Sequence, residues 1–297
     1  MRQSSPKVGV VILNWNGFDD TKGCVESLFN STYSNFLTFV VDNNSSGNDV
    51  SKLKEKFGSE IQIIENAENL GYCGGNNIGF SEAKKKDCEY ILILNNDTVI
   101  DKDCISELVK LLADNKKLVI AGATIMDYYD RTKIQCRGLT FSKWSGVSLA
   151  LDLNKSYKKR SNIKPKIASG ACFLIDSSFC EQLFDEQFFC YYDDTDLSLR
   201  ALESGKEIIV SAKALVYHKG SVSANKIGGF TEFQLIRNRF LVIEKHSSLP
   251  QKIVFLFVTI LLYTPFRLLV LLKNRKYQNI PHFFKGLSKG LLSFKFL

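Results

Sequence analysis

The sequence predicts an α/β protein in which a mostly parallel, doubly wound sheet is followed by a helical, membrane-associating C-terminal tail. Two observations lead to this expectation. Short apolar runs alternate with stretches of helical periodicity through residues 1–230, a pattern typical of parallel sheets covered by helices on both faces. Residues 231–297 combine long apolar runs with basic side chains. We therefore expect an α/β domain over residues 1–230 and a basic, apolar helical region over residues 231–297.

The first strand is expected at residues 8–13, a continuous apolar run suited to a buried position. Residues 19–29 have helical spacing, and residues 37–41 form the second apolar run. Residues 42–49 are rich in Asn, Asp, Ser and Gly, which favour a turn that caps the next helix. The later elements of this half are a strand at 61–64, a Gly/Asn-rich loop at 69–77, a helix at 78–86 and a strand at 90–94.

The second half of the α/β part continues the alternation. Residues 101–112 have helical spacing, and the apolar residues 118–121 predict a fifth strand. Residues 127–165 are polar and irregular and predict an excursion over the sheet. The remaining elements are a strand at 168–175, a helix at 177–183, a helix that begins within the segment FFCYYDDTDLSLR, and short strands at 208–210 and 214–217.

Composition excludes several classes of protein. The chain has 297 residues, of which 45% are hydrophobic and 24% charged, so it is neither disordered nor collagen-like and can bury a core. Its eight cysteines form no CxxC pair, and a chain of this size needs no disulfide framework, so we expect free thiols. The apolar run near the N-terminus is too short for a signal peptide, which predicts a cytoplasmic protein.

Polar side chains and glycines follow the first four predicted strands. Ligands of open α/β sheets bind beyond the carboxyl ends of the strands, so these residues should meet at one edge. Such an edge suits a polar, phosphate-bearing ligand. The residues are Asn14, Asn16 and Gly17 after the first strand, Asp42, Asn43, Asn44 and Ser45 after the second, Gly71, Gly74, Gly75, Asn76 and Asn77 after the third, and Asn95, Asn96 and Asp97 after the fourth.

The common nucleotide motifs are absent from this edge. No GxGxxG follows the first strand directly, and no GxxxxGK[ST] loop occurs, which excludes the usual NTP-cleaving site. Because the glycine-rich segment holds no lysine, Mg²⁺ or Mn²⁺ is the simplest partner for phosphate charge, and Asp97 is its candidate ligand. The alternative role of Asp97 is a cap ahead of Asp101.

A second acidic cluster consists of Asp193, Asp194 and Asp196, which follow four aromatic residues and open a predicted helix. Acids at a helix N-terminus complement its dipole, so a structural role is available. Three acids in four residues exceed what one cap requires, and one of them can serve as a general base. His218 follows a short strand and precedes a Gly-Ser turn.

The charge of the chain, +8 overall, is concentrated in the tail. Residues 231–297 hold eleven Lys/Arg and two acidic residues. Residues 253–272 have the length of a membrane span but are interrupted by Pro265 and Arg267, and residues 283–297 mix Phe and Leu with Lys at helical spacing. Such segments favour anionic lipid surfaces. The alternative is a buried helical hairpin with a solvated basic face, and the apolar runs between the lysines argue against nucleic acid.

Seven segments resemble an inverting glycosyltransferase of family 2 with the GT-A fold, and specifically its rhamnosyltransferase-like branch from bacterial surface polysaccharide synthesis. In the family's order over residues 8–223 they are VVILNWNG, VDNNSSG, ENLGYCGGNNIG, LILNNDT, SGACFLI, FDEQFFCYYDDTDLSLR and VYHKGS. Each segment alone is a loose match, whereas seven in the family's order are highly specific.

The resemblance implies a role for each matching position. Asp194 is expected to be the catalytic base, with Asp193 as second acid. Asp97 and His218 are expected to hold Mg²⁺ or Mn²⁺, although Asn95 stands where the family's metal motif has its first acid. The nucleotide-sugar is expected to contact Asn14, Asp42, Asn44, Gly75, Asn76 and Asn96, and the acceptor Gly170, Ala171 and Tyr192. Arg237, Asn238 and Arg239 resemble a stretch that would face diphosphate or lipid headgroups.

The implied activity is sugar transfer, with rhamnose as the candidate sugar, from a nucleotide-diphosphate donor to a hydroxyl of a glycan or lipid-linked acceptor at the inner face of the cell membrane. A nucleotidyltransferase is disfavoured because VVILNWNG lacks a basic, Gly-rich signature. The remaining alternative is a nucleotide-sugar-binding or membrane-scaffold protein that has this fold with impaired catalysis.

Overall fold

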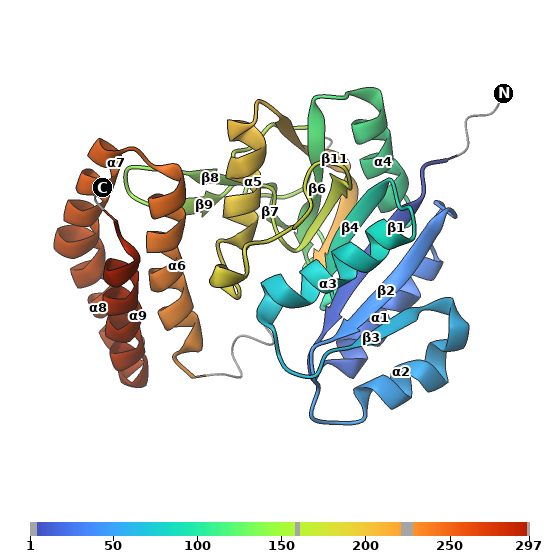
Figure 1. Cartoon of the computed structure of the whole chain (residues 1–297), viewed down its shortest axis with the longest axis horizontal. Coiled ribbons are helices and arrows are strands. Elements are labelled where there is room, and N and C mark those ends of the chain that lie inside the picture. Colours follow the sequence, from blue (N-terminus) through green and yellow to red (C-terminus); the bar gives the residue numbers. More distant parts are fainter. Residues whose placement is uncertain (1–4, 158–160, 221–227, 296–297) are drawn as a thin grey trace.

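The protein is built around a mixed β-sheet (Figure 1), seen in a computed structural model that describes residues 5–157, 161–220 and 228–295. Within these residues the strands lie in the order β3-β2-β1-β4-β10-β6-β11-β5, and β7 pairs with β6. The half formed by β3, β2, β1 and β4 is parallel, whereas β10 runs antiparallel to both β4 and β6. The predicted α/β class is confirmed, and the sheet is mixed because β10, β5 and β7 pair antiparallel with their neighbours.

The strands keep the predicted order, with some changes in length. The sheet consists of β1 (Val8–Asn14), β2 (Phe36–Asp42), β3 (Gln62–Glu65), β4 (Tyr90–Asn95), β5 (Thr98–Ile100), β6 (Leu118–Asp127), β7 (Ile134–Cys136), β10 (Cys172–Asp176) and β11 (Glu207–His218). A separate hairpin joins β8 (Leu139–Phe141) to β9 (Ser148–Ala150).

Helices cover both faces of the sheet. The apolar sides of α1 (Phe18–Phe29), α2 (Asp49–Phe57) and α4 (Cys104–Asp114) bury their side chains in the core cluster on one face. On the other face, α3 (Gly71–Lys85) and α5 (Asp193–Glu203) contribute to a second cluster. This arrangement is the doubly wound one that alternating strands and helices predict.

Helix α3 begins at Gly71, seven residues before the predicted start at residue 78. Its glycines had indicated a loop, but they allow the helix to lie directly on the sheet. A Cβ at Gly79 would lie 2.4 Å from Val11 Cγ1, and a Cβ at Gly75 would lie 2.3 Å from Leu13 Cδ1. The small residues therefore serve close helix–strand packing, which outweighs the low helix propensity of glycine.

Three further predictions differ from the structure. Residues 177–183 form turns instead of a helix, because Ser178 donates its backbone N–H and its hydroxyl to Asp176 and starts a turn there. Residues 127–165 are not entirely irregular, since they include β7, β8 and β9. The strands expected at 208–210 and 214–217 form one long strand, β11, with an irregularity between Val210 and Leu215.

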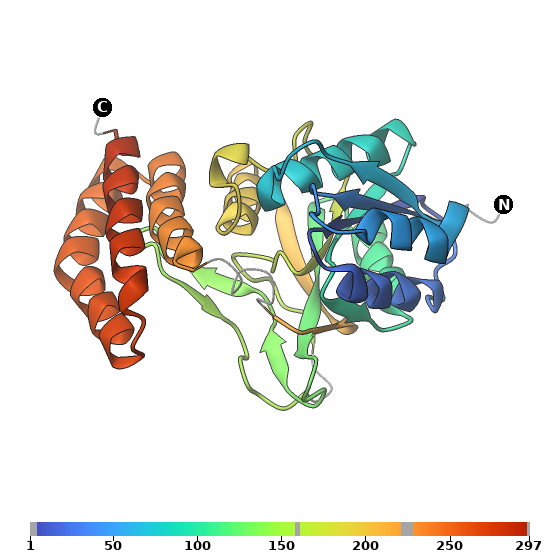
Figure 2. The ribbon, with the colours of Figure 1, turned by 90° about the horizontal axis from the view of Figure 1, so that it is seen from below.

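The C-terminal helices form a layer beside α5 (Figure 2). They are α6 (Phe230–His246), α7 (Leu249–Phe257), the π-helical segment η4 (Val258–Tyr263), α8 (Thr264–Lys273) and α9 (Ile280–Ser293). Helices α6 and α9 approach closely because Gly286 faces Ile236 and Gly290 faces Phe240. The helix does not break at Pro265, since the π-helical segment precedes that residue.

The outer face of this layer is apolar. Within the described residues, one helical stretch, Leu249–Lys273, is long and apolar enough to cross a membrane by length and composition, with a mean hydropathy of 2.2. Its protein-facing side packs on the layer through Phe255, Thr259 and Leu271, and Arg267 Nε lies 3.0 Å from Glu232 Oε2 of α6. The other side exposes Phe257, Ile260, Leu261, Leu262, Phe266 and Leu269.

Candidate active site

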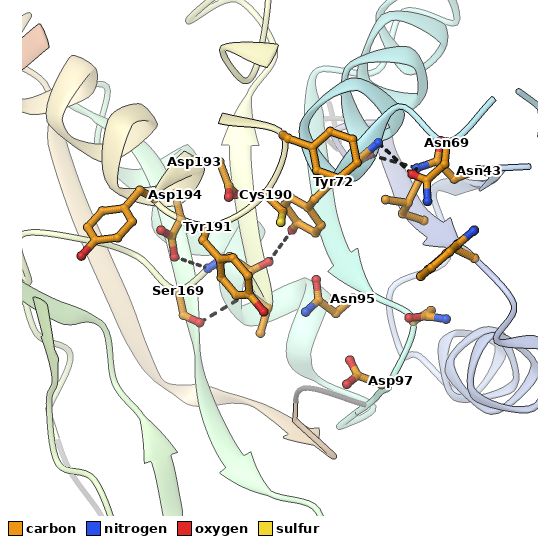
Figure 3. Close-up of a pocket in the computed structure, with 18 of the residues that line it drawn as sticks. Asn43, Asn69, Tyr72, Asn95, Asp97, Ser169, Cys190, Tyr191, Asp193 and Asp194 are labelled. Carbon is orange, nitrogen blue, oxygen red and sulfur yellow. Dashed lines mark hydrogen bonds between the residues drawn. The ribbon is translucent and has the colours of Figure 1, made fainter. Parts of the chain in front are cut away.

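A cavity of about 450 Å³ opens at the carboxyl ends of β1 and β4, where the sheet meets the segment that leads into α5 (Figure 3). It contains eight of the predicted site residues. Its lining includes Asn96, Asp97, Gly170, Ala171, Tyr192, Asp193, Asp194 and His218, together with Leu13, Trp15, Asn43, Asn69, Gly71, Tyr72, Asn95, Ser169, Phe189, Cys190, Tyr191 and Phe230.

The carboxylates of Asp193 and Asp194 are held in the first turn of α5 in different environments. Burial, with the neighbouring Asp194, raises the pKa of Asp193 to about 8. Burial also raises the pKa of Asp194, but the backbone N–H groups of Gly170 and Thr195 oppose the rise. The Gly170 N–H donates to Asp194 Oδ2 at 3.0 Å. Backbone N–H groups lower the pKa of Asp193 as well, but the charge of Asp194 raises it, so the pair holds its proton on Asp193 and its charge on Asp194.

A second polar group lies on the other side of the cavity, where the chain passes from β4 to β5. His218 Nε2 lies 3.1 Å from Asp97 Oδ1, and both side chains are largely buried. His218 Nδ1 lies 2.6 Å from Gln135 Oε1 on β7. With its hydrogen on Nδ1, His218 donates to Gln135 Oε1, and the lone pair of Nε2 is directed at Asp97. This is the tautomer that a metal-ligating histidine needs. Gln135 is a contributor that the sequence did not reveal.

These residues fit a divalent cation. Asp97 offers a carboxylate and His218 an imidazole nitrogen, and the buried side-chain oxygen Oδ1 of Asn95 has no hydrogen-bond partner. In the described part of the chain no group of three His, Cys, Asp or Glu side chains converges, so the cavity supplies two such ligands. Mg²⁺ and Mn²⁺ sites commonly combine one or two carboxylates with phosphate oxygens and water, which suits a site of this kind.

Asn14 and Asp42 lie together beneath the cavity instead of lining it. Asn14 Nδ2 donates to Asp42 Oδ1 at 2.7 Å and to Asp49 Oδ2 at 3.1 Å. The hydroxyl of Ser45 donates to Asp42 Oδ1 at 2.7 Å, and the Ser45 N–H donates to Oδ2. Both side chains are almost fully buried. This network fixes the ends of β1 and β2 and places Asp42 outside the cavity lining, and its expected nucleobase contact stays a prediction.

Three other residues expected to contact the nucleotide also lie outside the cavity lining, so these contacts stay predictions. Gly75 lies inside α3 against Leu13, and the buried amide of Asn76 donates to Tyr72 O within the same helix. Asn44 is exposed and lies outside the cavity lining. The positions of these three residues follow from the early start of α3 and from the tight turn after β2. The loop predicted for residues 69–77 did not anticipate the early start of the helix. Asn96 does line the cavity, and its amide donates to Thr21.

The acceptor-side predictions converge in the structure. Gly170 and Ala171 line the cavity next to Asp194, and Tyr72 donates its hydroxyl to Gly170 O at 2.8 Å. The hydroxyl of Tyr192 donates to Gly146 O at 3.2 Å. Aromatic residues that the sequence did not assign complete the wall, and Trp15, Tyr72, Phe189, Tyr191 and Phe230 are among them. The position of Trp15 directly after β1 and the aromatic run before Asp193 were the available signals.

Arg237, Asn238 and Arg239 do not face the cavity as expected. Arg237 donates to Gln187 O, Asn238 to three backbone oxygens of residues 188–191, and Arg239 to Ser145 O. Arg239 is 1% exposed and lies against the ring of Tyr263. The role that the resemblance implied, contact with diphosphate or lipid headgroups, is therefore replaced by contacts within the protein. Ser221, at the end of the VYHKGS segment, lies outside the described residues.

Comparison with known proteins adds independent information. The sequence model of glycosyl transferase family 2 matches residues 9–184. The low-salt glycan biosynthesis hexosyltransferase Agl10 of Haloferax volcanii is 27% identical over 244 residues, which is 79% of this chain and 74% of that protein. The dTDP-rhamnosyl transferase RfbF of Shigella flexneri is 23% identical over 224 residues, or 71% of this chain and 72% of that protein.

Solved structures share the fold at low identity. GalNAc-T7 with UDP, GalNAc and Mn²⁺ superposes with a TM-score of 0.66 at 14% identity, and the match covers 82% of this chain and 48% of that one. S. aureus TarS 1–349 with UDP has a TM-score of 0.56 at 14% identity, over 85% of this chain and 71% of that one. Because the family match spans more than half of the chain and the structural neighbours share its GT-A fold, the chain belongs to glycosyl transferase family 2 and is a glycosyltransferase.

Proposed function

We propose that the protein is an inverting glycosyltransferase that moves a sugar from a nucleotide-diphosphate donor to a hydroxyl of a glycan or lipid-linked acceptor in cell-surface polysaccharide synthesis. The observation that carries this proposal is the pairing of two polar groups across one cavity. The acidic pair Asp193–Asp194 lies on the α5 side, and Asp97 with His218 lies beyond β4. Figure 3 shows Asp194 and Asp97 on different elements around the same hollow.

The α5 side supports the proton transfer. Asp194 accepts the proton of the acceptor hydroxyl, whose oxygen forms a bond to the anomeric carbon of the sugar. The bond from that carbon to the diphosphate oxygen breaks on the opposite face, so the configuration inverts and the nucleoside diphosphate leaves with the electron pair. The Gly170 N–H holds Asp194 in place, and the protonated Asp193 keeps a second charge out of the pocket.

The opposite side supports the departure of the diphosphate. Asp97 and His218 would hold Mg²⁺ or Mn²⁺, with the side-chain oxygen of Asn95 beside them. A bound divalent cation supplies Lewis-acid stabilisation of the charge that develops on the leaving group. Gln135 and the backbone of Lys219, whose N–H donates to Asp97 O, orient these two side chains.

The names of the relatives support the choice of substrate class. One relative is described as a hexosyltransferase of glycan biosynthesis and another as a dTDP-rhamnosyl transferase, and two structural neighbours were solved with UDP. We therefore propose a hexose or deoxyhexose as the transferred sugar, with rhamnose as the first candidate.

We also propose that the protein works in the cytoplasm at the inner face of the membrane. The exposed apolar side of Leu249–Lys273 supports this proposal, together with the excess of Lys and Arg in residues 231–297. Such surfaces bind anionic lipid by burying apolar area and attracting headgroup charge. The acceptor would then be a glycan on a lipid carrier, presented at that surface.

The test is a panel of UDP-glucose, UDP-galactose, GDP-mannose and dTDP-rhamnose, first screened by thermal shift and then assayed for release of the nucleoside diphosphate. We expect one donor to raise the melting temperature and to be turned over with Mn²⁺ or Mg²⁺, and EDTA to abolish turnover. Donor binding without turnover under any metal would instead support the catalytically impaired binding protein, which Asn95, standing in place of the first metal-binding acid, favours. No binding of any nucleotide-sugar would contradict both.

A further inference from the structure

The segment that leads into α5 has an unusual backbone. Phe189, Tyr191 and Tyr192 have φ angles of 62°, 68° and 64°. Residues with side chains rarely adopt positive φ, and each such residue costs of order 1–3 kcal/mol unless the surroundings enforce it. The same segment lines the cavity and ends directly at Asp193 and Asp194. Its conformation therefore sets the position of the catalytic carboxylates and must be held by contacts from elsewhere.

Asn238 of α6 supplies such contacts. Its side chain is 0% exposed, and Nδ2 lies 2.8 Å from Phe188 O, 2.7 Å from Cys190 O and 2.9 Å from Tyr191 O. Three carbonyl oxygens around one amide fix the direction of that amide, because only its nitrogen can donate to them. The NH2 group carries two hydrogens, so one of them is shared between two of these oxygens. The side-chain oxygen of Asn238 is buried with no hydrogen-bond partner, a cost that the bonds donated by the NH2 group offset.

Two further residues, one on α6 and one on α3, donate hydrogen bonds to the same segment. Arg237 donates to Gln187 O at the start of the segment. From the opposite direction, the Cys73 N–H of α3 donates to Phe189 O at 3.0 Å. The strained segment is thus held between α3 and α6. Of these groups, Asn238 alone bonds three of the backbone carbonyls, among them that of Tyr191, one of the three residues with positive φ.

We propose that Asn238 is a positioning residue that holds residues 188–192 in their strained conformation and thereby orients Asp194 toward the acceptor hydroxyl. This inference rests on the proposed function. Asn238 bonds the wall that leads to the base, whereas the proposed donor and metal residues Asn96, Asp97 and His218 lie on other elements. Loss of its amide should therefore impair use of the acceptor and leave donor binding unchanged.

The first measurement needs no substrate. Hydrogen–deuterium exchange of the full chain is compared between wild type, Asn238→Ala and Asn238→Ser. We expect faster exchange in peptides covering residues 186–195 for both variants, with Ser smaller in effect because its hydroxyl keeps one donor, and unchanged exchange in peptides of β1 and β4. Unchanged exchange at 186–195, or an equal rise throughout the chain, would overturn the proposal.

The second measurement separates positioning from general damage. With the donor chosen by the panel above, we expect Asn238→Ala to lower kcat/KM for the acceptor about 10- to 100-fold, the range that small misplacements of reacting groups produce, and to keep the donor KM within about twofold. Gln234→Ala is the matched control. Gln234 lies about one turn earlier on α6, is 4% exposed, and has an unpartnered side-chain oxygen. We expect wild-type kinetics from it.

The two proposals fail in different ways. If the wild-type enzyme transfers no sugar, the proposed function fails, while the exchange data still decide whether Asn238 holds the segment. If the wild type is active and Asn238→Ala raises the donor KM as much as it impairs the acceptor, Asn238 has only a general structural role and the inference is wrong.

Discussion

Two adjacent aspartates at the start of α5 both have a pKa raised by burial, but different neighbours act on them. At Asp193 the charge of Asp194 adds to the effect of burial, whereas Asp194 accepts hydrogen bonds from the N–H groups of Gly170 and Thr195. The proposed division of roles thus depends on the groups around each residue. The sequence could nominate both residues, because acids in a first helical turn are visible in it, but not the hydrogen bonds that distinguish them.

The Asp194→Asn variant tests the assignment of the base. The amide cannot accept the acceptor proton, so we expect transfer to fall about 10²- to 10⁴-fold while donor binding persists. The measurements are the initial rate of nucleoside diphosphate release with acceptor present and the thermal shift with donor. Near-normal turnover would show that another group is the base.

Asp193 makes the stability of the fold depend on pH. Its pKa in the folded protein, about 8, lies above the ordinary aspartate value of 3.8, so the folded state binds the proton more tightly. Its contribution to stability is therefore full below about pH 4 and is lost as the pH rises through 8. We expect Asp193→Asn to weaken this decline and to be more stable than wild type at pH 8, in urea unfolding at pH 5 and pH 8. Equal slopes for both proteins would contradict the assigned pKa.

At the scale of single elements, a glycine can indicate either a loop or a close contact between a helix and a strand, and the sequence alone does not distinguish the two. In residues 69–77 it indicated a loop, but the structure uses it to bring α3 against β1 and β2. A Cβ at Gly79 would lie 2.4 Å from Val11 and 3.0 Å from Val41, both β-branched and stiff. Whether a glycine serves a turn or a close contact depends on the residue opposite it, which lies far away in the sequence.

We therefore expect Gly79→Ala to destabilise the protein by about 1–3 kcal/mol, the usual cost of overpacking a core. Gly23→Ala is the matched control. Gly23 also lies inside a helix, α1, but has no atom within 4 Å of the added Cβ, so alanine should stabilise by about 0.5–1 kcal/mol. Urea unfolding of both variants measures the difference. The packing argument is wrong if the two substitutions have the same sign.

Local patterns predicted the strands well and the connections poorly. The runs that became β1, β2 and β4 are continuous and apolar, and the structure starts or ends them within about one residue of the expected limits. β5 has only three residues, and its partner β11 lies more than a hundred residues later in the chain, so nothing local marks it. Gln135 could not be predicted from the sequence for the same reason, because it is linked to the site by its contact with His218 in the folded protein.

At the scale of the whole molecule, the acid-poor apolar region becomes one face of a helical layer. Leu249–Lys273 packs one side on α6 and α9 and exposes the other, and the Arg267–Glu232 ion pair anchors it to α6. A helix held in this way along its length is suited to lie in a membrane interface with its free side in the lipid.

We expect the protein to float with vesicles containing phosphatidylglycerol more than with vesicles of phosphatidylcholine alone, and less so at high salt. Leu261→Asp, at a site that is 63% exposed, should weaken this binding by about 10- to 100-fold, because a buried leucine contributes about 1.5–3 kcal/mol. Leu153→Asp is the control. Leu153 is 53% exposed and follows β9, and the adjacent Asn154 N–H donates to Ile134 O of β7. Equal losses in both variants would contradict an interface formed by the helical layer.

The contacts of α6 determine which shorter fragments of the chain can be expressed with the proposed site intact. The family match ends at residue 184, before Asp193 and Asp194, and a fragment ending there would lack the proposed proton acceptor. A longer fragment ending at His246 would keep Asn238 but lose the partners of α6, leaving Ile236 and Phe240 uncovered where Gly286, Gly290 and Phe255 now lie. The shortest piece that preserves the machinery therefore includes α9, and solubility is better sought by editing the outer side of Leu249–Lys273 than by trimming the chain.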